Sequence, residues 1–488
     1  MGQAISTPDP DTGENLGEKV LAVVTAPLSI CCNTRAPPRA SVLLTKKGEL
    51  PVCNAAYKGE LKELQSLAHQ GPGRKLNVLE KDADDNTPLH WAAVRGHKEV
   101  TEYLVASGAP INAKNKDKDT PIHWACSGGN ADVIKILLDA GADGKGRNSD
   151  NTTPLHFAAA DGHAQAVRTL INWDRKNKKQ TINAANNDRD TPLHWVASEG
   201  HLEVIKILVD EGAEVNAANK DQNTPLLVAC AEGHTEVAKL LITSGANVHA
   251  TNKDQWTAVH WACSGGRHEV LKQLLLNGGS PHVKDRRGET PLHFAAKKGD
   301  HVLIKILVAL GVDLQVVNVD GHTALHMAAD AGHVDAVRVL VEKGVNPDAV
   351  AESTGNTALH LAAAGGHAAA AEALCKGGAR VDVRNGVGNT PLHEAARLSH
   401  PAMVRSLLRA KANLQARDSN GRTPLELAPD LATKNAFTQS AGDCCCLGLL
   451  LVIFNFFLLF LNGQKNCFLE WSIYLATKDA CTQAASRY

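Results

Sequence analysis

The stretch DTPLHWVASEGHLEVIKILVDEGAEVNAANKD, residues 190–221, decides the fold, because variants of it recur along most of the chain. Thr191 is a favourable N-cap, and the proline after it suits the first helical position, where a backbone amide has no partner. Gly200 ends this short helix. The apolar residues from Val204 to Leu208 recur at helical spacing, which predicts a second helix with one apolar face.

The threonine that opens this unit returns along the chain at a spacing of about 33 residues. One helix pair of this size cannot bury its apolar face, so neighbouring pairs must stack into a continuous core. The unit begins at Thr87, Thr120, Thr153, Thr191, Thr224, Thr257, Thr290, Thr323, Thr357, Thr390 and Thr423.

These residues resemble the ankyrin repeat. TPLHWAAVRGH at 87–97, TPLHFAAADGH at 153–163 and TPLHWVASEGH at 191–201 are near-complete matches, and the resemblance covers residues 50–430. It implies an all-α repeat solenoid of stacked helix-turn-helix ankyrin repeats with short β-hairpin-like turns.

The two ends of the repeat region depart from the pattern. LPVCNAAYKGEL at 50–61 lacks the threonine and the histidine but keeps the small residues and the glycine, so we interpret it as an N-terminal cap, the first of twelve repeats. Pro429 interrupts the last unit, which leaves the C-terminal cap undefined. We expect a mostly disordered arm over 1–49, the array over 50–430, and a tail over 431–488 that contains a hydrophobic segment at 447–461.

Histidines are abundant, and two sets of them hold a fixed slot in the unit. In the ankyrin family the histidine of the TPLH motif hydrogen-bonds within and between repeats, so the resemblance implies a structural role, and no cluster has the compact spacing of zinc ligands. We expect no metal and no cofactor. The first set is His90, His123, His156, His194, His260, His293, His326, His360 and His393.

Composition and motifs argue against several function classes. The formal net charge is -1, which gives no long-range field for nucleic acid. No phosphate-binding glycine loop, nucleophile elbow or metalloprotease motif is present, so the chain is expected to be no enzyme and to take no small-molecule substrate. Cys126, Cys230 and Cys263 occupy slots that other units fill with alanine, which predicts buried thiols in a reducing compartment.

Repeat arrays of this family bind proteins through the turn before the threonine and the exposed end of the first helix, on their concave face. The turns give Lys116, Asp117, Lys118, Asp188, Arg189, Lys220, Gln222, Lys253, Gln255, Trp256, Arg286 and Arg287 as candidate contacts, and the helix ends give Arg95, Glu199, Glu232 and Lys297. Trp256 suits either a binding hot spot or packing on the adjacent turn.

The turn position two residues before the threonine differs between the halves of the array. It carries Lys118, Arg189 and Gln255 in earlier repeats and glycine, as at Gly321 and Gly388, in later ones. If this position needs positive φ, glycine adopts it freely and long side chains do so at a cost. We therefore predict that the N-terminal half is the main recognition surface.

Each end of the chain carries a candidate membrane signal. MGQAIS fits N-myristoylation of Gly2, which requires a cytosolic N-terminus. One acyl chain gives only marginal binding, so a second signal is needed. That signal is either palmitoylation or the segment LGLLLVIFNFFLLFL at 447–461, which inserts into a membrane or instead packs over the open end of the array. The palmitoylation candidates are Cys31, Cys32, Cys444, Cys445 and Cys446.

Two functions follow from this organisation. The first is a non-enzymatic scaffold, held at the cytosolic face of a membrane through lipid contact, that docks a partner protein on the array. The alternative is a cytoplasmic ankyrin-type inhibitor or regulator that occludes an enzyme or a transcription factor.

Overall fold

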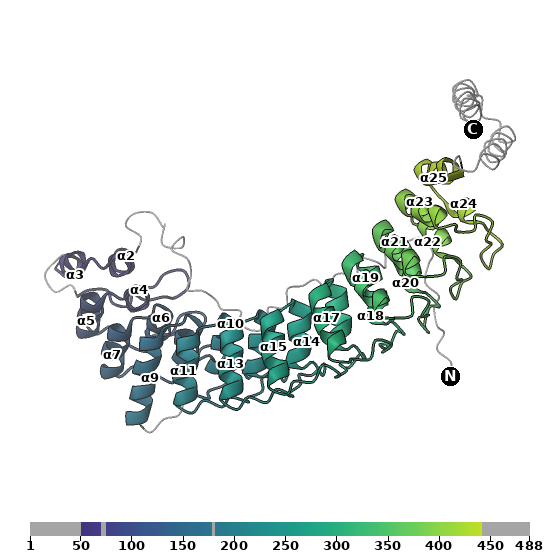
Figure 1. The fold of residues 1–488 in the computed structure, drawn as a ribbon. Helices are drawn as coiled ribbons and strands as arrows, with labels where there is room; N and C mark the ends of the chain where they lie inside the picture. Colours follow the sequence, from purple (N-terminus) through teal and green to yellow (C-terminus); the bar gives the residue numbers. More distant parts are fainter. Residues whose placement is uncertain (1–49, 70–74, 178–180, 442–488) are drawn as a thin grey trace, which may run out of the picture. The chain divides into compact units, whose positions relative to one another are not determined.

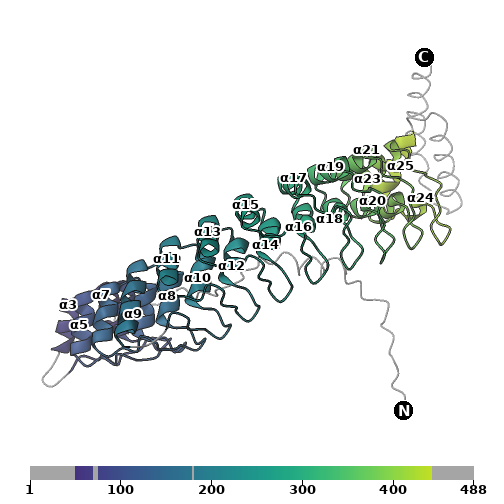
Figure 2. The ribbon, with the colours of Figure 1, turned by 60° about the horizontal axis from the view of Figure 1, so that its bottom comes forward.

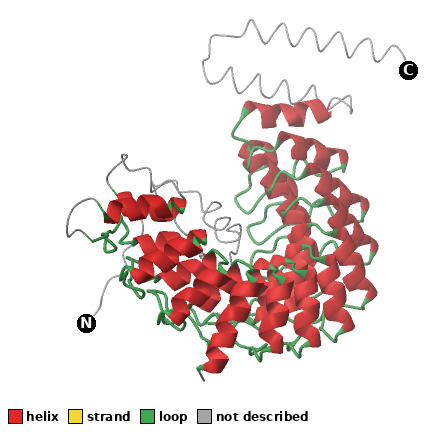
Figure 3. Cartoon of the chain, turned by 90° about the vertical axis from the view of Figure 1, so that its left-hand side faces the viewer, coloured by secondary structure: helices red, strands yellow, loops and turns green. Residues whose placement is uncertain are grey.

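The computed structural model describes residues 50–69, 75–177 and 181–441. These residues form helices joined by turns and contain no strand, as the predicted all-α repeat solenoid requires (Figure 3). The helices group into two compact units, Met1–Lys220 and Asp221–Tyr488.

Each repeat consists of a first helix and a second helix, which form two layers (Figure 1). The first helices are α2 (Pro51–Lys58), α4 (Pro88–Arg95), α6 (Pro121–Ser127), α8 (Pro154–Ala160), α10 (Pro192–Glu199), α12 (Pro225–Glu232), α14 (Ala258–Gly265), α16 (Pro291–Lys298), α18 (Ala324–Asp330), α20 (Ala358–Ala364), α22 (Pro391–Arg397) and α24 (Pro424–Leu427). The second helices are α3 (Leu61–Ala68), α5 (Lys98–Ala106), α7 (Ala131–Asp139), α9 (Ala164–Lys176), α11 (Leu202–Asp210), α13 (Thr235–Thr243), α15 (His268–Leu276), α17 (His301–Ala309), α19 (Val334–Glu342), α21 (Ala368–Lys376), α23 (Pro401–Arg409) and α25 (Leu431–Ala441).

Local sequence sets the ends of the first helices. In α4, the Thr87 side chain caps the helix, and the His90 side chain reaches back to the Thr87 amide. Gly96 ends the helix in the left-handed conformation, with φ of 74°. Glycine is the residue that adopts this conformation at no steric cost, so the glycine at this point of the unit fixes the length of the helix.

In the first unit, helices stack on the same helices of the neighbouring repeats. The first helix α4 lies between α2 and α6, and the second helix α7 lies between α5 and α9. Trp91 and Trp124 pack edge to face with ring centroids 5.0 Å apart, beside the buried Cys53. The core of this unit therefore runs from repeat to repeat, as the small size of each helix pair demands.

In the second unit the stacking is the same, and α25, the second helix of the last repeat, covers α23. First helices α14, α16, α18 and α20 follow one another side by side, and α21 lies between α19 and α23. The final first helix, α24, has four residues and ends before Pro429, but α25 packs against α23. Ala436 and Phe437 of α25 are completely buried. This end of the array is thus closed by residues that do not follow the repeat pattern.

The turns project from one end of the helix pairs (Figure 2). Each is closed like a β-hairpin, although no strand is formed in the residues described. In the turn before Thr120, the amide of Asn115 donates to the carbonyl of Asp119 over 3.1 Å. The side-chain oxygen of Asn115 accepts a hydrogen bond from the Asp119 amide at 2.8 Å, which stabilises the turn.

Candidate protein-binding surface

The histidine after the Thr-Pro-Leu motif links the first helix to the next repeat in most of the array. In His90, Nδ1 accepts hydrogen bonds from the amide and the hydroxyl of Thr87, at 3.1 and 2.9 Å. Nε2 then carries the proton and donates to the carbonyl of Asp119, 3.0 Å away. The same contacts to the next repeat occur at His123, His156, His260, His293, His326, His360 and His393.

Burial makes these imidazoles poor bases. It lowers the pKa of His156 from 6.5 to about 3, and the pKa of His90 from 6.5 to about 4. A neutral imidazole has one donor and one acceptor nitrogen, and both are occupied here. These histidines therefore stabilise the array. Cys126, Cys230 and Cys263 are also completely buried, which raises the pKa of each thiol.

A second set of histidines, at the start of the second helix, links several repeats to the preceding one. His97 Nε2 lies 3.0 Å from the carbonyl of Tyr57, and His163 Nε2 lies 2.9 Å from that of Ser127. At one such position Asp300 replaces histidine and lies beside the exposed His268, at 2.5 Å. The two histidine sets together account for the abundance of histidine, because both form hydrogen bonds between neighbouring repeats.

The turn position two residues before the threonine has the left-handed conformation throughout the array. Lys118, Arg189 and Gln255 have φ of 61°, 63° and 62°, and Gly321 and Gly388 have φ of 78° and 79°. The backbone requirement is thus the same in both halves, while the residue type is not. Long side chains at this position are kept against a conformational preference of about 1–2 kcal/mol.

Neighbouring turns are joined along their tips within each unit. In the first unit, the Lys116 amide donates to the Asp84 carbonyl at 3.0 Å, and the two side chains form an ion pair at 3.7 Å. In the second unit, Lys253 Nζ lies 3.3 Å from Asp221 Oδ1. These pairs are exposed, so each contributes little to stability, but they hold lysine side chains along the row of tips.

Most of the predicted contact residues lie on the surface. Whether they contact a partner stays a prediction, since no partner is present. Exposed are Arg95, Lys116, Lys118, Asp188, Arg189, Glu199, Lys220, Gln222, Lys253, Gln255, Arg286 and Arg287, and half-buried are Asp117, Glu232, Trp256 and Lys297. We call these sixteen residues the tip surface; it has one part in each unit.

Trp256 packs between two repeats. Its ring centroid lies 4.4 Å from those of Trp261 and Phe294, and its Nε1 donates to Asp285 over 3.0 Å. Of the two roles considered for this residue, packing on the adjacent turn is present in the structure. Because the ring is half-buried, part of it still faces the surface.

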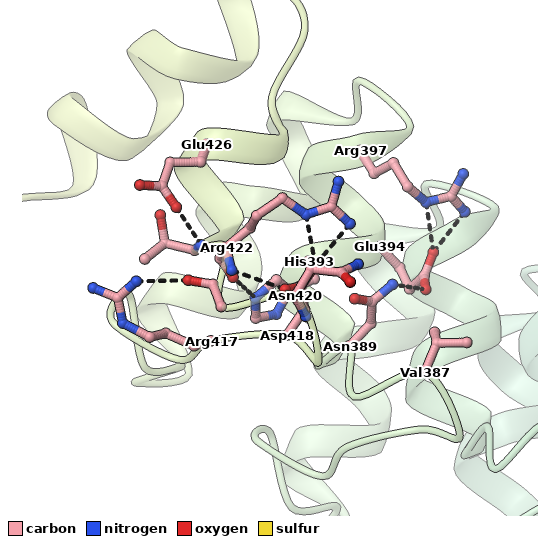
Figure 4. A network of polar contacts seen from close by, with 12 residues as sticks. Val387, Asn389, His393, Glu394, Arg397, Arg417, Asp418, Asn420, Arg422 and Glu426 are labelled. Atoms are coloured by element: carbon pink, nitrogen blue, oxygen red, sulfur yellow. Dashed lines mark hydrogen bonds and ion pairs between the residues drawn. The ribbon is translucent and has the colours of Figure 1, made fainter.

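The last repeats contain a polar network that the sequence analysis did not predict (Figure 4). Glu394 takes the position that Trp91 and Phe294 hold in other first helices, yet it is 8% exposed. Its carboxylate accepts from Asn389 at 2.8 Å and from Arg397 at 2.7 Å. Although burial acts to raise the pKa of Glu394, these partners hold it below its usual value. A charge at an aromatic position, with arginine three residues later, was the available signal.

None of the helices that the structure describes has both the length and the apolar composition needed to cross a bilayer. The acylation candidates Gly2, Cys31, Cys32, Cys444, Cys445 and Cys446 and the segment 447–461 lie outside the described residues.

Comparison with known proteins identifies the repeats. A family model described as ankyrin repeats in three copies matches residues 174–252, 193–285, 233–318, 259–351, 293–385 and 349–418. A second, described as ankyrin repeats in many copies, matches residues 52–105, 89–138 and 132–171.

Curated relatives match over short stretches. Ankyrin repeat domain-containing protein 13C of Danio rerio is 40% identical over 68 residues, which cover 14% of this chain and 13% of that protein. The 26S proteasome non-ATPase regulatory subunit 10 of Homo sapiens is 41% identical over 66 residues, which cover 14% of this chain and 28% of that protein. The chain thus spans less than a third of either relative. Because the family matches extend over more than half of its length, the chain belongs to the ankyrin-repeat family.

Proposed function

We propose that the chain is a non-enzymatic scaffold that docks a partner protein on the tip surface and is held at the cytosolic face of a membrane. Ankyrin repeats are protein-binding modules, so the scaffold role follows from the family. One observation supports the placement of the partner site. Lys118, Arg189 and Gln255 hold a positive-φ position that glycine fills in later repeats. Side chains that cost stability where they stand are expected to serve a contact.

The partner site is tested with glycine rather than alanine. The triple variant Lys118→Gly, Arg189→Gly and Gln255→Gly removes the three side chains and also relieves the backbone, so it should fold at least as stably as the parent chain. The full chain and this variant are used to capture partners from cytosol, and the affinity for each captured protein is measured. We expect a loss of about 10-fold or more, since three contacts of about 0.5–1 kcal/mol disappear.

Lys98, Lys135 and Lys206 provide the matched control, because they are exposed on second helices of the first unit. Their triple change to alanine removes lysines away from the tips and should leave the affinity unchanged. A partner that binds the glycine variant as tightly as the parent chain would remove the tip surface from the proposal.

Membrane attachment is proposed from the sequence of both ends. The segment 447–461 is apolar except for Asn455, and Gly2 fits the acylation pattern. The structure weakens the alternative in which this segment covers the open end of the array, because α25 already packs over α23 with Phe437 completely buried. This supports the part of the proposal in which the segment inserts into a membrane.

Fractionation tests the attachment. The full chain should sediment with membranes, and Gly2→Ala should release part of it, because one of two anchors is lost. A chain that stays in the supernatant, with and without Gly2, would favour the alternative, a cytoplasmic inhibitor that occludes its partner.

A further inference from the structure

Basic side chains gather at the C-terminal ends of the last second helices. Lys376 and Arg409 are the final residues of α21 and α23, which pack side by side. Arg405 lies one turn before Arg409, and Lys411 follows two residues after it. Among the described residues none of these four forms an ion pair, and Lys376, Arg409 and Lys411 are exposed. We call these four residues the basic patch.

The repeat pattern does not require these charges. The final residues of α7 and α11, in the equivalent position of earlier repeats, are Asp139 and Asp210. A cation complements the dipole at a helix end, but α7 and α11 fold with an acid there. Neither α23 nor α25 contains an aspartate or a glutamate. Glu372 is the one acidic residue of α21, and its carboxylate accepts a hydrogen bond from Ser406 of α23 at 2.7 Å. The four cations of the patch therefore exceed the acidic residues on these three helices. Lys434 of α25 adds a further positive charge.

The last described residue, Ala441, lies beside this patch. Asp430, just before α25, lies close to Ser399, just before α23, and the Ser399 side chain helps to lower the pKa of the Asp430 carboxyl. Because α25 then packs along α23, the two helices run in the same direction. They span roughly 16 and 14 Å, so their C-terminal ends lie together. Ala441 therefore lies at the Arg409 end of α23.

Only five residues, 442–446, separate Ala441 from the apolar segment 447–461. Fully extended, they reach about 18 Å. If the segment enters a bilayer, the end of α25 stays within that distance of the hydrocarbon core. The lipid headgroups occupy part of this distance. The basic patch is thus kept close to the membrane surface, within reach of its potential, which extends over about 10 Å.

From this geometry we propose that the basic patch binds anionic lipid headgroups of the membrane into which 447–461 inserts. This inference rests on the proposed membrane attachment and adds its orientation, with the C-terminal ends of α21 and α23 against the lipid. Juxtamembrane cations are attracted to the negative surface of the cytosolic leaflet, by about five-fold in partitioning for each residue.

The test uses the full chain, diluted from detergent onto vesicles of phosphatidylcholine alone or of phosphatidylcholine with phosphatidylserine. The patch variant carries Lys376→Gln, Arg409→Gln and Lys411→Gln. The control variant carries Lys98→Gln, Lys135→Gln and Lys206→Gln, which removes the same charge from second helices far along the sequence. Bound fractions are measured by co-sedimentation at low and at high salt, and circular dichroism checks the fold.

We expect the parent chain and the control variant to prefer vesicles with phosphatidylserine, with a preference that high salt abolishes. The patch variant should lose this preference, by about 100-fold in partitioning, while it still binds phosphatidylcholine. If the patch and control variants had the same preference for phosphatidylserine, the basic patch would not be a lipid-binding site, although the membrane attachment would stand. This result is expected if the patch binds an acidic protein. Failure of the parent chain to bind either vesicle would overturn the attachment itself, and the patch proposal with it.

Discussion

The indole Nε1 of Trp256 donates a hydrogen bond to Oδ2 of Asp285 in the next repeat, 3.0 Å away. In most other repeats the residue at the Asp285 position is an asparagine that donates in the opposite sense, as Asn115 does to Asn86 at 2.9 Å. The direction is reversed here because an indole can only donate and an ionised carboxylate can only accept. The tryptophan and the aspartate are therefore a matched pair, although they lie in different repeats.

This pair predicts a change of sign in a double-mutant cycle. Asp285→Asn alone should destabilise the chain by about 1–2 kcal/mol, because Oδ1 is occupied by the amides of Arg287 and Glu289 and the new amide group faces the indole donor. In a Trp256→Asn background the same change restores the usual asparagine pair and should be neutral or stabilising. Urea unfolding of the four proteins measures both effects. Equal losses in the two backgrounds would show that the hydrogen bond contributes nothing.

Two glycines with the same backbone conformation allow the cost of backbone strain to be measured separately from the cost of a steric clash. Gly321 and Gly421 both have φ of 78°. A Cβ at Gly321 would lie 2.4 Å from the amide nitrogen of Glu352, whereas nothing lies within 4 Å of one at Gly421. Gly421→Ala should therefore cost about 1 kcal/mol, the left-handed preference alone, and Gly321→Ala about 1–3 kcal/mol more. Thermal unfolding compares them, and identical losses would contradict the contact.

The repeat is the part of the fold that sequence reasoning predicts well. The threonine caps, the glycine stops and the positive φ near the threonine all follow from residues a few positions apart, and the structure agrees at Thr87, Gly96 and Gly321. Because the turn tips keep one place in every unit, the exposure of Lys118 and Arg189 was also predictable.

Contacts that depend on departures from the repeat were not predictable in the same way. The sequence left two roles for Trp256, since its acceptor lies in the following repeat. Glu394 is stabilised by Asn389 and Arg397, which come from a turn and from the end of α22. Phe437 is buried although no repeat motif surrounds it, because α25 covers the apolar face that the array leaves at its end. Each case requires knowing which elements meet.

The buried histidines predict that the array loses stability in mild acid. Burial lowers the pKa of each to about 3 or 4, from 6.5 in the unfolded chain, so between pH 6.5 and pH 4 the unfolded chain binds more protons. Stability is complete above 6.5 and falls as the pH drops, by about 1.4 kcal/mol per pH unit for each histidine. The histidines concerned are His90, His123, His156, His260 and His326.

Urea unfolding at several pH values measures this slope. His260→Gln should reduce the slope by about one proton per molecule, because one buried imidazole is lost. A free energy of unfolding that stays constant between about pH 7 and about pH 5 would contradict the burial of these imidazoles.

The closing helix α25 predicts local unfolding at one end of the second unit. Phe437→Ala removes a completely buried ring and should cost about 3–5 kcal/mol. Because each repeat contacts only its neighbours, the loss is expected to stay near α23 and not to reach α15. Hydrogen exchange measures this: amides of α23 should exchange faster in the variant, those of α15 at the parental rate. Asn435→Ala, at an exposed position of the same helix, is the control and should change neither. If α23 kept its protection in the Phe437 variant, α25 would not close the array, and the segment 447–461 would again be a candidate for that role.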